Sequence, residues 1–102
     1  MIINDLDNFN KLQLNMSTYE DKVIHCKNEN ETMTIIQMLE SQGYEYAIPF
    51  KSLNEFAESF AEDNGWEGCW RICQTRGIAY NQDVNHWIEN GYEIIEYEDL
   101  WQ

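Results

Sequence analysis

The chain has 102 residues, 43% of them hydrophobic and 14% aromatic, which suits one globular domain with a core and excludes a disordered acidic tail. Nineteen acidic and six basic side chains give a net charge of −13, and residues 52–102 hold eleven of the acids and two of the bases. A field of this sign repels nucleic acids and anionic membranes and attracts basic partners. We therefore expect a single domain over residues 1–102 that binds neither nucleic acid nor membrane directly.

The cysteine count and the N-terminus bear on the compartment. Three cysteines, Cys26, Cys69 and Cys73, make an odd number, and MIINDLDNFN is polar and acidic where a signal peptide is basic and then apolar. No apolar run reaches the length of a membrane span. These features predict a cytoplasmic protein with reduced thiols.

The first half of the chain predicts a weakly patterned start, a strand and a capped helix. Residues 1–19 form either a short helix or an arm lying on the body, 17–21 a turn, and 22–27 a strand. Asn28 caps the next helix, with Glu31 at the third helical position, and Gly43 ends it. The buried stripe of this helix is expected to contain Thr32, Ile35, Ile36 and Leu39. Residues 44–50 predict a strand that Pro49 shortens.

The most legible element is the helix between Ser52 and Gly65. Ser52 and Glu55 form a capping box, and Gly65 stands where a left-handed residue ends a helix. One face of this helix is apolar, with Leu53, Phe56, Ala57, Phe60 and Ala61 at helical spacing. The other face carries acids and no basic residue, so one side must be buried and the other is purely anionic.

The remaining elements complete an α+β pattern. Residues 65–68 predict a turn that displays Trp66, and 69–74 and 77–81 predict a hairpin in which Gly77 is available for a positive φ. A third helix is expected to start at an Asn81 cap, to end at Gly91, and to bury Val84, Trp87 and Ile88. Residues 92–97 predict a last strand and 98–102 an acidic tail. The fold class predicted is α+β, with a single mixed or antiparallel sheet of four to five strands and about three helices, mainly on one face.

No pattern in the chain indicates catalysis, a metal or a cofactor. His25 and Cys26 are adjacent in a predicted strand and so point to opposite faces, and no C-x-x-C or H-x-x-x-H pair occurs. A thiol nucleophile needs electropositive surroundings, which this chain supplies only at Arg71. The glycines are scattered and form no phosphate-binding loop. We expect a protein that is not an enzyme and has no catalytic residue, metal or cofactor.

Two groups of side chains are candidates for binding a partner. The first is the acidic face of the 52–65 helix and the turn after it, where successive acids lie about 5–6 Å apart, comparable with phosphates along a nucleic-acid strand. The second alternates acids with aromatic residues at the C-terminus, a composition typical of protein interfaces. The candidate residues are Glu55, Glu58, Glu62, Asp63, Trp66, Glu67, Glu96, Glu98, Asp99 and Trp101. The alternative interpretation is that these acids are a plain solvated surface.

Residues 23–100 also resemble a class of known proteins. The resemblance lies in the segments Val23–Cys26, Gly43–Tyr44, Cys69–Ile72, Gly77–Tyr80 and Gly91–Leu100. In these segments the chain is similar to small acidic proteins encoded by phages and mobile elements of low-GC Gram-positive bacteria. Several proteins of that kind are anti-defence factors, notably anti-CRISPR proteins that occupy basic nucleic-acid channels. The resemblance implies no catalytic residues.

Taken with the charge, the resemblance implies an inhibitor protein in the bacterial cytoplasm. The expected function is non-enzymatic inhibition of a nucleic-acid-dependent defence effector, with Cas9 as the foremost target, by carboxylates that occupy a basic groove. The alternative is a phage or host regulatory module that binds a protein partner through an aromatic and apolar patch. Salt-sensitive binding distinguishes the first from the second.

Overall fold

The computed structural model describes residues 14–45 and 53–101 of the chain, apart from the side chains of Leu53, Asn54, Phe56, Asn64 and Trp101. Most of the expected N-terminal arm or helix therefore lies outside the described residues. The described elements, in chain order, are the 3-10 helix η1 (Met16–Tyr19), β1 (Val23–Cys26), α2 (Glu29–Ser41), α3 (Leu53–Asn64), β2 (Gly68–Ile72), β3 (Ile78–Asn81), α4 (Val84–Glu89), β4 (Ile94–Glu96) and the 3-10 helix η2 (Tyr97–Trp101).

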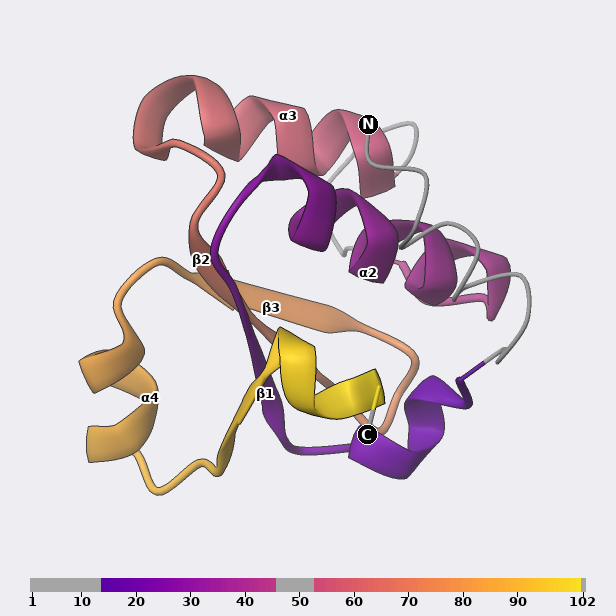
Figure 1. Ribbon diagram of the computed structural model, residues 1–102. Coiled ribbons are helices and arrows are strands. Elements are labelled where there is room, and N and C mark those ends of the chain that lie inside the picture. Colours follow the sequence, from indigo (N-terminus) through magenta and orange to yellow (C-terminus); the bar gives the residue numbers. More distant parts are fainter. Residues whose placement is uncertain (1–13, 46–52, 102) are drawn as a thin grey trace.

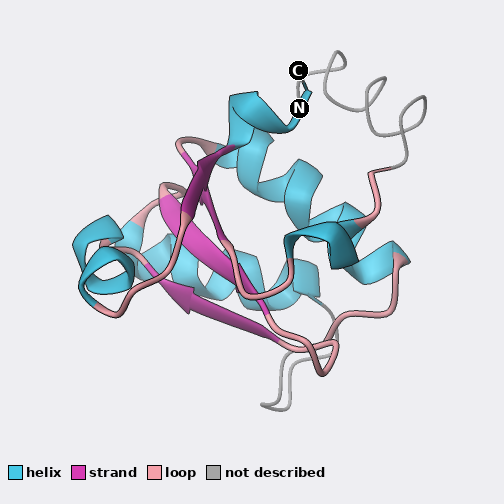
Figure 2. Cartoon of the chain, turned by 90° about the horizontal axis from the view of Figure 1, so that it is seen from below, coloured by secondary structure: helices cyan, strands magenta, loops and turns pink. Residues whose placement is uncertain are grey.

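The four strands form one open mixed sheet in the order β3-β2-β1-β4, which confirms the α+β class (Figures 1 and 2). β1 pairs antiparallel with β2 and parallel with β4, and β2 pairs antiparallel with β3 as a hairpin. All four residues of β1 are buried, because it lies inside the sheet and is covered on both faces. The histidine in this strand is therefore a largely buried polar side chain.

The two faces of the sheet carry hydrophobic clusters of different size. The larger core packs alternate strand residues, among them Ile24, Trp70 and Ile72, against α2 and α3. A smaller cluster on the other face joins Val23 and Cys69 to Trp87 of α4. In Figure 1, α2 and α3 lie together above the sheet, and α4 stands apart from them. None of the helices in the described parts of the chain has the length and apolarity of a membrane crossing.

α2 agrees with its prediction. The Asn28 side chain accepts a hydrogen bond from the Glu31 amide at 2.9 Å, and Gly43 has a φ of 86°. The Glu31 carboxylate in turn accepts from the Lys27 amide at 2.8 Å, so two free donors at the helix start are satisfied. The predicted stripe is buried: Thr32, Ile35, Ile36 and Leu39 are all at most 2% exposed.

α3 also ends where its sequence predicts. Gly65 has a φ of 79°, and its amide donates to the Ala61 carbonyl oxygen at 2.9 Å. Ala57 is 2% exposed, and the half-buried Phe60 lies against Tyr80, with 4.5 Å between the ring centroids. The predicted capping serine lies outside the described residues. Ala57 and Phe60, two of the residues that the pattern predicts, thus fix this side of the helix to the core.

The hairpin and α4 differ from prediction in detail. The positive φ of the hairpin, 66°, falls on Arg76 and not on Gly77, and the Arg76 guanidinium lies 5.3 Å from the Tyr44 ring centroid. The N-cap of α4 is Asp83, whose carboxylate accepts from the Asn85 amide at 2.9 Å. Ile88, predicted to be buried, is 55% exposed, because this short helix presents only Trp87 fully to the sheet.

The last predicted strand is shorter than expected. The last strand contains only Ile94–Glu96, and the tail after it winds into η2, which buries Tyr97 and Leu100 in the main core. Of the strand predicted over residues 44–50, Glu45 forms one parallel bridge to Gly77, and residues 46–50 lie outside the described part.

Candidate functional site

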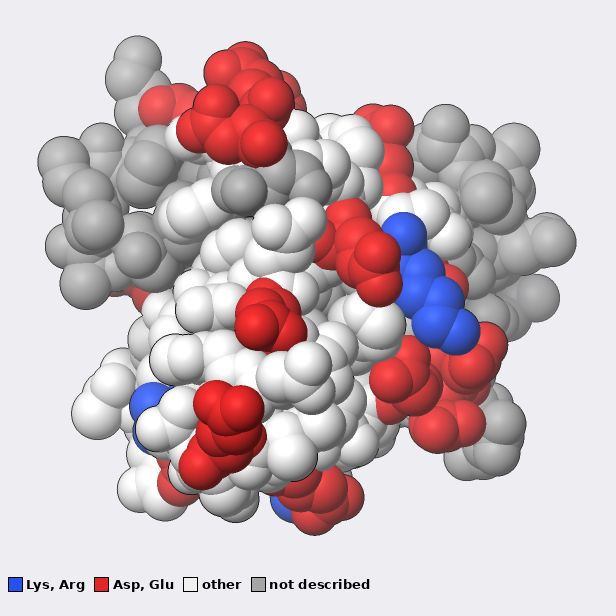
Figure 3. All heavy atoms as spheres, turned by 90° about the vertical axis from the view of Figure 1, so that its left-hand side faces the viewer, with Lys and Arg blue, Asp and Glu red and all other residues white. Residues whose placement is uncertain are grey.

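The acidic face of α3 is exposed and is held on a rigid element. Glu55, Glu58, Glu62 and Asp63 are exposed, while Ala57 on the opposite side is buried. None of the salt bridges among the described residues involves Glu58, Glu62 or Asp63. On the face drawn in Figure 3, acidic side chains gather at the top, where α3 lies, and basic side chains are few.

The two arginines of the second half of the chain are engaged elsewhere. The Arg71 guanidinium pairs with Asp21 at 3.1 Å and lies 4.7 Å from the Tyr92 ring centroid. Arg76 donates to the Gln42 carbonyl oxygen. In the described part of the chain neither arginine pairs with Glu58, Glu62 or Asp63, and these three exposed carboxylates face solvent.

A shallow open hollow lies on this helix. Its volume is about 260 Å³, and Glu58, Ala61, Glu62 and Trp66 line it. Trp66 is half-buried against the main core, and its carbonyl oxygen accepts a hydrogen bond from the Thr32 hydroxyl at 2.8 Å. The hollow thus combines a fixed aromatic wall with two carboxylates, groups that suit a cationic side chain.

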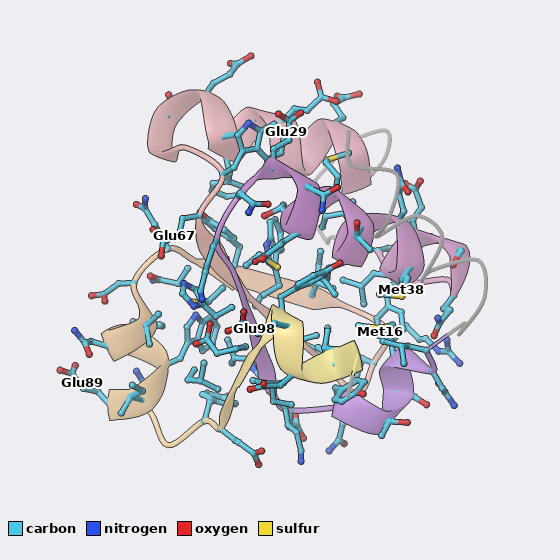
Figure 4. All side chains as sticks on the ribbon, in the orientation of Figure 1. Met16, Glu29, Met38, Glu67, Glu89 and Glu98 are labelled. Carbon is cyan, nitrogen blue, oxygen red and sulfur yellow. The ribbon has the colours of Figure 1, made fainter. Side chains whose placement is uncertain are left out.

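A second cluster, centred on His25, was not predicted from the sequence. Nδ1 of His25 lies 2.8 Å from a carboxylate oxygen of Glu96, and Nε2 lies 3.0 Å from one of Glu67. His25 and Glu96 are partners in the parallel register of β1 and β4, and Glu67 lies just before β2. Figure 4 shows Glu67 on the α4 side of the molecule, away from Met16 and Met38. The signal in the sequence was the lone histidine in an otherwise apolar strand.

The cysteines beside this cluster are not poised as nucleophiles. Cys69, the cross-strand partner of His25, is fully buried, and burial raises its pKa to about 12, with Glu96, Glu67 and Asp83 adding to the effect. Burial also raises the pKa of Cys26 well above its usual value. Neither thiol forms an appreciable amount of thiolate at neutral pH.

The predicted C-terminal acids do not form one free surface. Glu98 pairs with Lys27 at 3.4 Å, and the hydrogen bond from Lys27 to Glu98 raises the pKa of that lysine. Asp99 is exposed, and the side chain of Trp101 lies outside the described part. The structure therefore brings Glu58, Glu62 and Trp66 together at one hollow, and it places Glu67 and Glu96 on His25.

The described residues contain no group of three His, Cys, Asp or Glu side chains that could hold a metal ion. Comparison with protein-family models, with curated proteins and with solved structures finds no match to this chain.

Proposed function

We propose that this protein is a non-enzymatic acidic inhibitor that binds a basic, nucleic-acid-binding groove of another protein through α3. One observation carries the proposal: Glu58, Glu62 and Asp63 stand exposed on a helix whose other side is packed into the core, and no salt bridge within the described residues neutralises them. A rigid row of unneutralised carboxylates has the charge pattern of a phosphate strand.

The contact begins with long-range attraction. A net charge of −13 steers the protein toward a basic groove, and the carboxylates of α3 then replace phosphates on the groove's Arg and Lys side chains. Spacings of three and four residues place the Glu55, Glu58 and Glu62 side chains about 5–6 Å apart along the helix.

The hollow supplies a specific anchor for this contact. An arginine of the partner fits there with its guanidinium plane against the Trp66 ring and its N–H groups on the Glu58 and Glu62 carboxylates. Arginine suits such a site better than lysine, because its planar group both stacks and donates in pairs. Arg and Trp are also the residue types that most often dominate interface energetics.

The resemblance to phage and mobile-element proteins directs the search for the partner. It favours a CRISPR effector in the bacterial cytoplasm, and Cas9 is the first such effector to test. Binding there competes with guide RNA or target DNA, and it needs no chemical step by this protein.

The test is competition under controlled salt. We expect affinity for the effector to fall steeply as NaCl is raised, and nucleic acid to displace the protein. The double substitution Glu58→Lys and Glu62→Lys should weaken binding at least about tenfold, which corresponds to about 1.4 kcal/mol. The matched control is Glu89→Lys, which changes one exposed charge on α4. Binding that is indifferent to salt and to the double substitution rules the mechanism out.

A partner bound through an apolar patch is the second candidate function. The observation that favours it is Ile88, a large hydrophobic side chain 55% exposed on α4, together with the half-buried Trp66. It predicts salt-resistant binding that is lost on Trp66→Ala or Trp101→Ala.

A further inference from the structure

His25 has more hydrogen-bond partners than a neutral imidazole can satisfy. Both of its ring nitrogens lie within 3.0 Å of carboxylate oxygens, and its side chain is 10% exposed. A carboxylate only accepts hydrogen bonds, whereas a neutral imidazole has one N–H donor and one bare nitrogen. Both bonds to ionised carboxylates therefore exist together only when the ring carries a proton on each nitrogen.

The two carboxylates are held with different firmness. Glu96 is on β4, in register beside His25, and its side chain is 36% exposed. Glu67 lies in the short connection between α3 and β2, and its side chain is 60% exposed. When the ring loses a proton, one carboxylate faces a bare nitrogen and is repelled. Glu67 is the partner that has room to move into water.

We infer that His25 controls the surface charge of this region by holding the Glu67 carboxylate when the ring is doubly protonated and releasing it when the ring is neutral. The neutral ring keeps its proton on Nδ1, donating to Glu96. The backbone of the connection stays in place, because the Thr32 hydroxyl donates to the Trp66 carbonyl and the Tyr80 hydroxyl, at 3.4 Å, to the Glu67 carbonyl. Only the Glu67 side chain moves.

The other titratable groups near His25 do not take part in the hydrogen-bond exchange among His25, Glu67 and Glu96. Among the described side chains, Cys69 of β2 faces the ring, and with its pKa at about 12 it stays neutral throughout. Asp83, before α4, adds a negative charge near Cys69. Lys27, which directly follows β1, is bound to Glu98.

The consequence reaches the proposed binding site, and this step rests on the proposed function. Glu67 directly follows Trp66, which forms a wall of the hollow. When His25 loses its proton and releases Glu67, a free carboxylate is added beside the hollow. The positive charge of the imidazolium ring disappears from the same region. Binding to a basic partner should then tighten as the pH rises through the titration of His25.

The first experiment uses the free protein, so it does not depend on any partner. NMR would follow the His25 ring nitrogens and the Glu67 side-chain carboxyl signal between about pH 5 and pH 9. We expect both to change with one midpoint, and the neutral ring to be the Nδ1–H tautomer. A neutral Nε2–H tautomer, or a Glu67 signal that does not follow His25, overturns the inference.

Two variants distinguish the release of Glu67 by His25 from a general effect of removing one negative charge. Glu67→Gln puts on Nε2 an amide that can turn to pair with either form of the ring, so this side chain should stay in place and release no charge. Glu93→Gln makes the same charge change at a residue paired with Lys22, and it should leave the Glu67 response intact. If Glu93→Gln abolishes the Glu67 response, the inference fails.

Binding to a basic partner then gives a separate readout. A two-fold or greater gain in affinity across the His25 titration, absent in Glu67→Gln, is the expected result. If the Glu67 signal follows His25 but no salt-sensitive binding exists, the proposed function fails while the His25 exchange stands.

Discussion

Single residues in this protein are constrained by close contacts that cannot be predicted from the sequence. Gly68 starts β2 without a positive φ, yet a Cβ there would lie 2.4 Å from Cε1 and 2.6 Å from the hydroxyl oxygen of Tyr80. The Tyr80 ring cannot withdraw easily, since it lies between Phe60 and Trp70 with centroid distances of 4.5 and 4.6 Å. Gly68 is therefore required for packing and not for a turn.

Gly68→Ala should accordingly destabilise the protein by about 1–3 kcal/mol through overpacking. The matched control is Gly77→Ala, where the nearest contact of an added Cβ, at 3.7 Å, is an ordinary one. Chemical denaturation of both variants measures the difference. Equal stabilities of the two variants would mean that the Tyr80 ring yields at little cost.

At the scale of elements, α3 and α4 are held in different ways. α3 is a 12-residue helix, and among its described side chains Ala57 and Phe60 pack into the main core. α4 has six residues, and its attachment depends on Trp87, which is 5% exposed, packs edge-on against Tyr92 and donates to the Asn81 carbonyl oxygen at 3.3 Å. One side chain thus fixes this helix to the second face of the sheet.

Trp87→Ala should lower the free energy of unfolding by about 3–5 kcal/mol, because it empties the small cluster under α4. Ile88→Ala, one residue along the same helix, removes a side chain that is 55% exposed and should change stability by no more than about 0.5 kcal/mol. The measurement is urea denaturation of both variants. A large effect of Ile88→Ala would show that α4 packs by the face that the sequence predicted.

For the whole molecule, the dominant fact is unbalanced charge. The ion pairs Lys22–Glu93, Lys27–Glu98 and Arg71–Asp21 use three of the six basic residues. These pairs are partly exposed, and exposed ion pairs contribute little to the free energy of folding. Most carboxylates therefore repel one another in the folded state, which opposes compaction.

Added salt should consequently stabilise this protein. The screening length falls from about 30 Å at 0.01 M to about 10 Å at 0.1 M ionic strength, which weakens repulsion across the molecule. We expect the melting temperature to rise over this range, and to rise less in the double variant Glu58→Gln and Glu62→Gln. A melting temperature that falls with salt would mean that the ion pairs outweigh the repulsion.

Local signals in the chain determined much of this structure. Features that depend on neighbours within a few residues were predicted correctly. They are the Asn28 cap, the left-handed glycines 43, 65 and 91, the apolar stripe of α2, the core positions of Ala57 and Phe60 in α3, and the β2–β3 hairpin. The anionic face of α3 follows from the same periodicity.

The tertiary structure decided what depends on residues far apart in the chain. The sheet order β3-β2-β1-β4 places Glu96 beside His25, and the connection after α3 brings Glu67 to the other side of the same ring. These contacts span 71 and 42 residues, and no periodicity encodes them. Sequence alone therefore showed an acidic protein with a rigid anionic helix. Only the fold could show which acids stay free and which are held by a histidine, because pairing between distant strands sets the distances between their charges.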